Sequence, residues 1–194
     1  MLADDGYLIV KDFLGNEKST SLLNEIKLIF NDVPNKPNGY EIIKSTKNNF
    51  IKYINFPCIA VTKNNLLEIA VDVFEKLKSE IPQFEYKNYL LTNIDIQESK
   101  GKNILMHVDA EKDMFRCFLF LKGGKKDSGS LKYIKKTHLR DYFVQHYLDD
   151  YLKEKKLNQN TFDSNLAFIE VEKGDLVLMN TWGFHGSCIT KTSR

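Results

Sequence analysis

The chain has 194 residues, enough for one domain with its own hydrophobic core. Its 28 basic and 26 acidic residues leave a net charge of +2, and 42% of its residues are hydrophobic. This ordinary, nearly neutral composition argues against a nucleic-acid partner and against binding to a membrane surface. No stretch approaches the roughly 18 apolar residues of a transmembrane helix.

The first half of the sequence predicts two helices. Residues 6–10 form a short β-rich run, and apolar residues then recur at helical spacing over 17–31. Two prolines and a glycine predict a loop over 34–39. A second amphipathic helix is predicted over 66–81, where Pro82 ends it.

The second half predicts strands separated by glycine-containing turns, with one helical insert over 138–157. Helices followed by strands predict an α+β domain. We expect its core to be a double-stranded β-helix, a jelly roll of cupin-like form, with the N-terminal helices packed on one sheet. No repeat or linker marks a second domain, so we expect one domain over 1–194. The predicted strands cover residues 86–96, 104–110, 115–121, 130–134, 166–171 and 175–180.

The three cysteines, Cys58, Cys117 and Cys188, are odd in number and lack CxxC spacing. They predict neither a disulfide framework nor a structural zinc site, and we expect Cys117 and Cys188 to be small buried side chains. The acidic start of the chain lacks the basic stretch and apolar run of a signal peptide. We therefore expect a cytoplasmic protein, in a reducing setting that keeps iron ferrous.

The most informative chemical signal is His107-Val-Asp109 together with His185. Residues i and i+2 of a strand point to the same face, so His107 and Asp109 can aim an imidazole and a carboxylate at one ion. His185 follows a predicted strand that begins after Gly174. Two histidines and one carboxylate with open positions opposite are the facial triad of non-haem Fe(II) oxygenases. We predict that these three residues bind the metal, although HxD alone is often an ordinary surface pair.

Several segments resemble the phytanoyl-CoA dioxygenase family of Fe(II)- and 2-oxoglutarate-dependent oxygenases. The ten residues from Asp5, Asp-Gly-Tyr-Leu-Ile-Val-Lys-Asp-Phe-Leu, are similar to the family's N-terminal entry. His107-Val-Asp109 matches its HxD motif. Residues 129–138 resemble its G-S-x-x-x-I-x-x-S-H pattern, with threonine in place of the second serine. Gly174-Asp-Leu-Val-Leu resembles the strand that leads to the distal histidine.

The resemblance implies that the cofactors are Fe(II) and 2-oxoglutarate. It implies that a small-molecule substrate is hydroxylated with dioxygen, releasing succinate and CO2. It also implies that Arg194 pairs with the distal carboxylate of 2-oxoglutarate and that Ser187 assists it, with Asn93 a third candidate for the same co-substrate. A carboxylate at Asp109 favours hydroxylation over halogenation, because similar halogenases carry a small residue at that position.

Arg194 is the last residue of the sequence, at a point where a jelly roll should continue into a final strand. Two alternatives remain. Either the natural chain is longer, or the domain is a trimmed form that lacks its last strand and has a weakened co-substrate site. Lys191 and Arg116 are then the alternative counter-charges for 2-oxoglutarate.

Other functions stay open on the sequence alone. One alternative is a catalytically inactive binding or regulatory module on the same jelly-roll scaffold. The other is a cupin-like metalloenzyme that does not use 2-oxoglutarate. We expect His138 to be structural and His146 to lie on the surface of the insert. The sequence carries no signal for the substrate's identity or for the oligomeric state. Lysines beside two turns are candidates for binding an anionic group, although solvated lysines are common there: Lys122, Lys125, Lys126, Lys132, Lys135 and Lys136.

Overall fold

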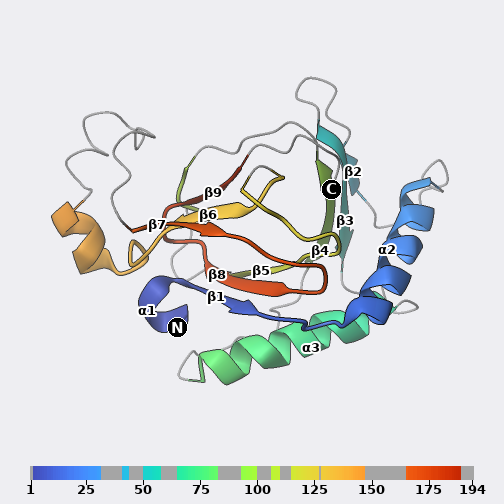
Figure 1. The fold of residues 1–194 in the computed structure, drawn as a ribbon, viewed down its shortest axis with the longest axis horizontal. Coiled ribbons are helices and arrows are strands. Elements are labelled where there is room, and N and C mark those ends of the chain that lie inside the picture. Colours follow the sequence, from blue (N-terminus) through green and yellow to red (C-terminus); the bar gives the residue numbers. More distant parts are fainter. Residues whose placement is uncertain are drawn as a thin grey trace.

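Figure 1 shows the fold in a computed structural model, which describes residues 2–31, 41–43, 50–57, 65–82, 93–99, 106–109, 115–126, 128–146 and 165–188. These residues form helices and antiparallel strands. The helices are α1 (Leu2–Asp5), α2 (Asn16–Asn31) and α3 (Asn65–Glu80), and a further helical segment covers 140–146. The strands are β1 (Tyr7–Val10), β2 (Glu41–Ile43), β3 (Phe50–Pro57), β4 (Asn93–Ser99), β5 (Phe115–Leu119), β6 (Leu131–Ile134), β7 (Leu166–Ile169), β8 (Leu176–Asn180) and β9 (His185–Ser187).

Strand β8 is the centre of the first sheet, whose order is β1-β8-β5 with both pairings antiparallel. Its sequence Leu-Val-Leu-Met-Asn is almost entirely apolar, because both of its faces are covered. Leu176 and Leu178 point to one face, where they pack with Leu77 of α3 and Leu2 of α1. The two helices therefore cover this face of the sheet (Figure 1).

The opposite face of β8 packs on the second sheet, whose order is β7-β6-β9. Val177 and Met179 lie in one buried cluster with Leu131 and Tyr133 of β6 and Ile169 of β7. Successive residues of β8 thus alternate between the helical layer and the second sheet, as the pleat of a strand requires. The candidate site is built at one end of this two-sheet core, where β8 turns into β9.

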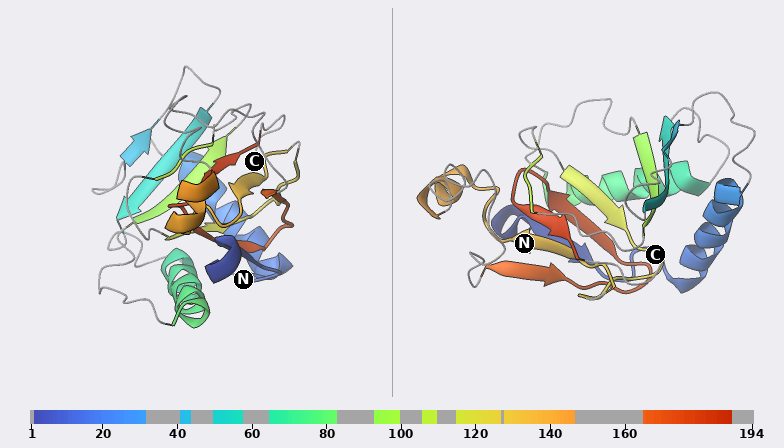
Figure 2. Two further views of the ribbon diagram at one scale, coloured as in Figure 1. Left: turned by 90° about the vertical axis from the view of Figure 1, so that its left-hand side faces the viewer. Right: turned by 90° about the horizontal axis from the view of Figure 1, so that it is seen from above.

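A third antiparallel sheet has the order β2-β3-β4 and stands near α2 (Figures 1 and 2). The β-rich run predicted over 6–10 corresponds to β1, but the sequence prediction missed β2 and β3 between α2 and α3. Their Ile, Tyr and Phe residues are typical of strands, but lysine and asparagine residues between them hide the alternation.

Most other predicted elements are confirmed within one to three residues where the structure describes them. The predicted helices correspond to α2 and α3, and the strands predicted over 115–121, 130–134, 166–171 and 175–180 correspond to β5, β6, β7 and β8. The strand predicted over 86–96 is β4, shifted towards its C-terminal end, and residues 83–92 lie outside the described residues. The predicted loop over 34–39 and the insert beyond 146 also lie outside them. None of the described helices is long and apolar enough to cross a membrane.

The cysteine prediction is right for one residue and wrong for another. Cys188 is buried, whereas Cys117 is exposed, and both are free thiols. Cys117 lies on β5, which is an outer strand of its sheet among the described residues, in the order β1-β8-β5. Cys58 lies outside the described residues.

Candidate metal centre

The two histidines of the predicted triad are direct partners across a β-bridge. The His107 amide donates to the His185 carbonyl and the His185 amide donates to the His107 carbonyl, each over 2.9 Å. Of the strand predicted over 104–110, the structure describes residues 106–109, which contribute this bridge at His107 rather than a regular strand. A residue pair that exchanges both hydrogen bonds projects its side chains to the same face. The two imidazole rings accordingly lie with their centroids 4.4 Å apart.

Asp109 adds a carboxylate to the two imidazoles. Its amide donates to the Thr181 carbonyl over 3.0 Å, which ties this end of the segment to the β8–β9 turn. Asp109 Oδ1 lies 3.6 Å from His107 Nε2 and 4.0 Å from His185 Nε2. The donor atoms of the three side chains all lie within 4.8 Å of one another. Among the residues that the structure describes, this is the group of His, Cys, Asp or Glu side chains able to converge on one ion.

The hydrogen bond of His185 selects which ring nitrogen is available. Its Nδ1 lies 2.9 Å from the Gly183 carbonyl oxygen. A carbonyl only accepts, so Nδ1 carries the proton and Nε2 keeps its lone pair for a metal. Burial lowers the pKa of His185, and the nearby His107 and Arg116 lower it further, against the raising effects of Gly183 and Asp109. The ring is thus held in the neutral form that metal binding needs.

The carboxylate of Asp109 uses its two oxygens differently. Oδ1 faces the imidazoles, while Oδ2 accepts a hydrogen bond from Arg116 Nε over 3.1 Å. The Arg116 side chain is 50% exposed, and that of Asp109 is 16% exposed. The sequence had suggested Arg116 only as an alternative counter-charge for 2-oxoglutarate. Arg116 lies on β5, where it pairs with Met179 of β8. This position brings its side chain to Asp109 instead.

The turn between β8 and β9 is fixed by two buried side chains of the segment that follows β6. The Tyr133 hydroxyl donates to the Asn180 carbonyl over 2.9 Å, and the Thr137 hydroxyl accepts from the Phe184 amide over 2.9 Å. The same Thr137 hydroxyl donates to the Ile134 carbonyl over 2.7 Å. Both side chains are almost fully buried, so no water competes for these bonds. They lock the backbone immediately before His185.

Gly183 is required in this turn because the Tyr133 side chain occupies the space that a Cβ would need. A Cβ at Gly183 would overlap the Tyr133 hydroxyl and would lie 3.0 Å from Thr137 Oγ1. The carbonyl of the same glycine orients His185. The sequence analysis missed Tyr133 and Gly183. The available signal was the Trp-Gly-Phe-His run, in which a glycine stands two residues before a candidate ligand.

His138 is structural, as the sequence predicted. It is buried, and its Nε2 lies 3.0 Å from the Ala3 carbonyl oxygen at the start of the chain. Burial lowers its pKa, against smaller raising effects from the Ala3 hydrogen bond and from Asp5 and Asp4. The neutral ring fastens α1 to the segment that carries Thr137. His146 is exposed and lies against Tyr142, with ring centroids 4.4 Å apart and the rings tilted by 39°.

The three predicted co-substrate residues are described to different extents. Ser187 lies on β9 two residues after His185, and the β6 partners of these two residues are Leu131 and Tyr133. Ser187 therefore projects from the same face of the strand as His185. Asn93 is the first residue of β4 and pairs with Pro57, but its side chain lies outside what the structure describes. Arg194 and Lys191 also lie outside the described residues.

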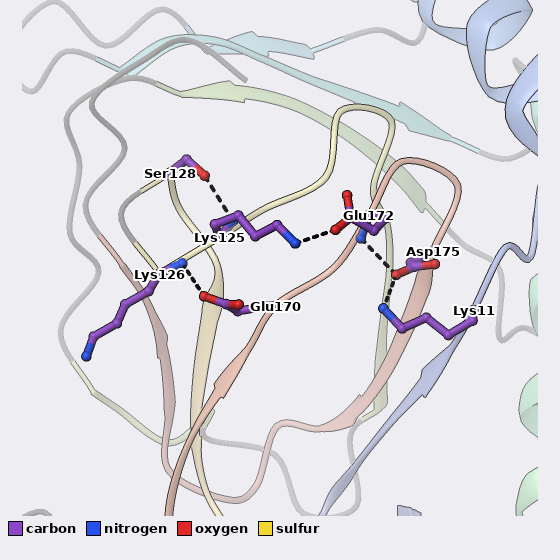
Figure 3. A network of polar contacts seen from close by, with 7 residues as sticks. All are labelled: Lys11, Lys125, Lys126, Ser128, Glu170, Glu172 and Asp175. Atoms are coloured by element: carbon purple, nitrogen blue, oxygen red, sulfur yellow. Dashed lines mark hydrogen bonds and ion pairs between the residues drawn. The ribbon is translucent and has the colours of Figure 1, made fainter.

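In the lysine-rich turns, Lys125 and Lys126 interact with carboxylates of the chain itself (Figure 3). Lys125 forms an ion pair with Glu172, which raises the lysine's pKa, and the Lys126 amide donates to Glu170 over 2.9 Å. The Lys126 ammonium lies 4.2 Å from the ring centroid of Phe168. The neighbouring carboxylates offset the positive charge. These described residues therefore give no support for a site that binds a phosphate group.

Comparison with known proteins finds likeness in structure alone. No family model matches this chain, and no curated protein matches it in sequence. HygX from Streptomyces hygroscopicus, solved with nickel and 2-oxoglutarate bound, superimposes with a TM-score of 0.62 at 14% identity, covering 100% of this chain and 80% of HygX. The epimerase SnoN from nogalamycin biosynthesis, a non-haem α-ketoglutarate-dependent enzyme, superimposes with a TM-score of 0.64 at 11% identity, covering 98% of this chain and 74% of SnoN.

This chain shares their fold. A third similar structure is the carbocyclase SnoK, also non-haem and α-ketoglutarate-dependent, with a TM-score of 0.57 at 15% identity over 98% of this chain and 76% of SnoK. Structures of these enzymes contain nickel or iron with 2-oxoglutarate, and this chain has a His-Asp-His group that can hold a metal. The narrower resemblance to phytanoyl-CoA dioxygenases stays a prediction.

Proposed function

We propose that the protein is an Fe(II)- and 2-oxoglutarate-dependent oxygenase that binds its metal through His107, Asp109 and His185. The observation that carries the proposal is the convergence of two imidazoles and one carboxylate, from segments 78 residues apart, on a fold shared with enzymes of this type. Imidazole and carboxylate are the ligand types of the non-haem Fe(II) facial triad. When bound, Fe(II) with 2-oxoglutarate and dioxygen supplies the oxidation of an unactivated C–H bond, with succinate and CO2 as co-products.

The residues of this chain orient the ligands and leave one side of the site open. Gly183 fixes the tautomer of His185, while the hydrogen bonds of Tyr133 and Thr137 hold the backbone before it. The His107 side chain is 45% exposed, whereas that of His185 is 8% exposed. We propose that substrate reaches the metal from the His107 side, because the opposite side is filled by the two-sheet core.

We propose the same co-substrate residues as the sequence indicates. The position of Ser187 on the His185 face of β9 supports a hydroxyl contact with the carboxylate of 2-oxoglutarate. Arg194 would supply the guanidinium that pairs with this carboxylate, and Asn93 would supply an amide. We further propose that residues 1–194 belong to one jelly-roll domain. The facing sheets β1-β8-β5 and β7-β6-β9, with the site at one end, support this arrangement.

The proposed reaction is hydroxylation of a small molecule. Small-molecule substrates are supported by the similar structures, since HygX was solved with hygromycin B and SnoN with nogalamycin RO. Hydroxylation is supported by the carboxylate of Asp109, which occupies the position that halide takes in halogenases of this type. SnoN and SnoK are described as an epimerase and a carbocyclase, so other oxidative outcomes occur on this fold.

Anaerobic titration with 2-oxoglutarate tests the proposed function. The Fe(II)-loaded protein should develop a weak visible charge-transfer band as 2-oxoglutarate is added, and the band should be absent in His107→Ala. Admission of dioxygen should then produce succinate. Wild-type protein that binds Fe(II) but shows neither the band nor succinate would favour a metalloprotein that does not use 2-oxoglutarate.

A further inference from the structure

We propose that Arg116 is a positioning residue that keeps Asp109 as a one-oxygen ligand, by holding Oδ2 through its Nε–H. This inference rests on the proposed function, since it concerns how the chain presents its carboxylate to the metal. Asp109 Oδ2 accepts from Arg116 Nε at 3.1 Å, while Oδ1 lies 3.6 Å from His107 Nε2. One oxygen is therefore engaged by the protein and the other faces the imidazoles.

Strands β5 and β8 set this geometry together, although neither strand carries a metal ligand itself. Arg116 lies on β5 opposite Met179 of β8, and Thr181, two residues after Met179, accepts the amide of Asp109. The guanidinium and the carboxylate are thus brought to one end of β8 by separate backbone contacts.

The hydrogen bond matters because a carboxylate can bind a metal with one oxygen or with two. A carboxylate bound through both oxygens takes an additional coordination position. A facial triad needs its remaining positions for the bidentate co-substrate and for dioxygen. A charge-assisted hydrogen bond to Oδ2 opposes the two-oxygen mode, because it would have to break before Oδ2 reached the metal. Hydrogen bonds from neighbouring side chains to metal ligands control the orientation of those ligands.

A stabilising surface ion pair is the competing explanation for the same contact. Arg116 is half exposed, and ion pairs of this exposure contribute about 0–1 kcal/mol to stability. An ion pair of that kind predicts no effect on metal coordination. The two explanations therefore differ in what they predict for the metal rather than for folding.

Two substitutions separate the hydrogen bond from the charge. Arg116→Gln places an amide N–H at the same number of bonds from Cα as Nε, and Arg116→Met places a methyl group there. Both variants lose the positive charge, so their difference reports the hydrogen bond alone. Arg140→Met is the matched control, because Arg140 is an exposed arginine that lies over the Trp182 ring rather than at Asp109.

The measurement is the number of exchangeable water molecules on bound Mn(II), obtained from water-proton relaxation, with thermal unfolding of the metal-free proteins beside it. We expect about three waters in wild type, Arg116→Gln and Arg140→Met, as a six-coordinate ion with three protein donors requires. We expect about two in Arg116→Met, with metal-free melting temperatures that agree within about 2 °C. An Arg116→Met protein that melts normally but no longer binds Mn(II), while Arg116→Gln still does, also supports the positioning role.

Three results would overturn the inference, and the third would also overturn the proposed function. Equal water numbers in all four proteins would show that Arg116 does not control the carboxylate. Equal changes in Arg116→Gln and Arg116→Met would assign the effect to charge and not to the hydrogen bond. Wild-type protein that binds no Mn(II) and no Fe(II) would overturn both this inference and the proposed function. The first two results leave metal binding by wild type intact, so they overturn the role of Arg116 alone.

Discussion

His185 and His107 face the same carboxylate, but they belong to parts of the molecule that are built differently. His185 begins β9, is 8% exposed, and follows a turn held by the buried side chains of Tyr133 and Thr137. His107 belongs to a four-residue described segment, is 45% exposed, and is tied to the core through its bridge to His185. One histidine is thus part of the core, while the other stands at its edge.

The difference indicates how the site combines a fixed backbone at His185 with a metal position that ligands can reach from the His107 side. The HxD segment makes backbone hydrogen bonds with the β8–β9 region at both His107 and Asp109. The β8–β9 turn, which is the rigid side of the site, therefore positions the exposed HxD segment, which is the open side. Substitutions in the β8–β9 turn should damage the whole site, whereas the loss of His107 should leave a vacancy that a small ligand can fill.

The largest expected effect is the loss of a metal ligand. His107→Gly and His185→Gly should each weaken Fe(II) binding by more than about 100-fold, since even the loss of an outer partner of a ligand costs 10–100-fold. Added imidazole should restore binding to His107→Gly at least tenfold better than to His185→Gly, because the first cavity opens to solvent and the second is enclosed. Competition with a chromophoric chelator, with and without imidazole, measures both effects.

His146→Gly serves as the control for a histidine loss at an exposed position away from the triad, and it should bind Fe(II) like wild type. Equal rescue of both ligand variants by imidazole would mean that the two sides of the site are equally open. The contrast between a buried and an exposed ligand would then have no functional meaning.

The next largest effect should follow overpacking of the rigid side. Gly183→Ala puts a methyl group where the Tyr133 hydroxyl lies, so the turn before His185 must move. Overpacking in a buried region costs about 3 kcal/mol at the upper end, which lowers the melting temperature of a chain of this length by roughly 6–12 °C. Calorimetry of the metal-free protein measures the loss, and metal affinity should fall in the same variant.

Gly124→Ala is the matched control for Gly183→Ala. Gly124 is also buried, but its Cβ would meet the nearest atom, Phe120 Cε1, at 3.4 Å, an ordinary contact distance. It should therefore melt close to wild type. Gly183→Ala melting as high as Gly124→Ala would show that Tyr133 does not constrain the turn.

A smaller effect is expected at Thr137, where only hydrogen bonds are lost. Thr137→Val keeps the shape but leaves the buried Phe184 amide without its acceptor, at a cost of about 1–3 kcal/mol. Thr137→Ser keeps the hydroxyl and should lose much less. Denaturant unfolding of both variants measures the difference. Similar stability of the valine and serine variants would remove Thr137 from the anchoring of His185.

Local sequence patterns predicted the elements whose structure depends on neighbouring residues. They failed for contacts between residues that are distant in the sequence. Helical spacing located α2 and α3, and the apolar run after Gly174 located β8. The i, i+2 rule paired His107 with Asp109 correctly on one face. The HxD segment does not form a regular strand over its described residues 106–109, where the pairing is one bridge to a residue 78 positions later.

The roles of Arg116, Tyr133 and Gly183 were not predictable, because each depends on a contact between segments whose sequence separation carries no pattern. Arg116 had been considered only for its charge. Its partner Asp109 follows from the pairing of β5 with β8 in one sheet. Tyr133 has the pattern of an ordinary strand tyrosine, and its role depends on Gly183, which lies 50 positions later in the β8–β9 turn and leaves room for its side chain.

The smallest effect should appear at the opposite end of β8, where Asp175 closes the turn before the strand (Figure 3). Its carboxylate accepts from the Asp12 amide at 2.9 Å, the Glu172 amide at 2.8 Å and Lys11 Nζ at 2.7 Å. Burial raises the pKa of Asp175, but these hydrogen bonds outweigh it and hold the pKa below its usual value. The stabilisation is therefore present above the unfolded-state pKa of about 3.9 and is lost as the pH falls through the lower folded-state value.

Asp175→Asn should remove this pH dependence. At pH 7 the variant should be less stable by about 1 kcal/mol, since its side-chain NH2 cannot accept the hydrogen bond that one of the two carboxylate oxygens accepts in wild type. Between pH 5 and pH 2 the gap to wild type should narrow, because wild type loses the charge that the variant never had. Lys11→Met should change little, because the Lys11 side chain is 61% exposed and its ion pair is screened by water. Urea unfolding across this pH range distinguishes the cases: a constant gap would assign the effect of Asp175→Asn to packing, and would leave the acid stability of this half of the molecule to other carboxylates.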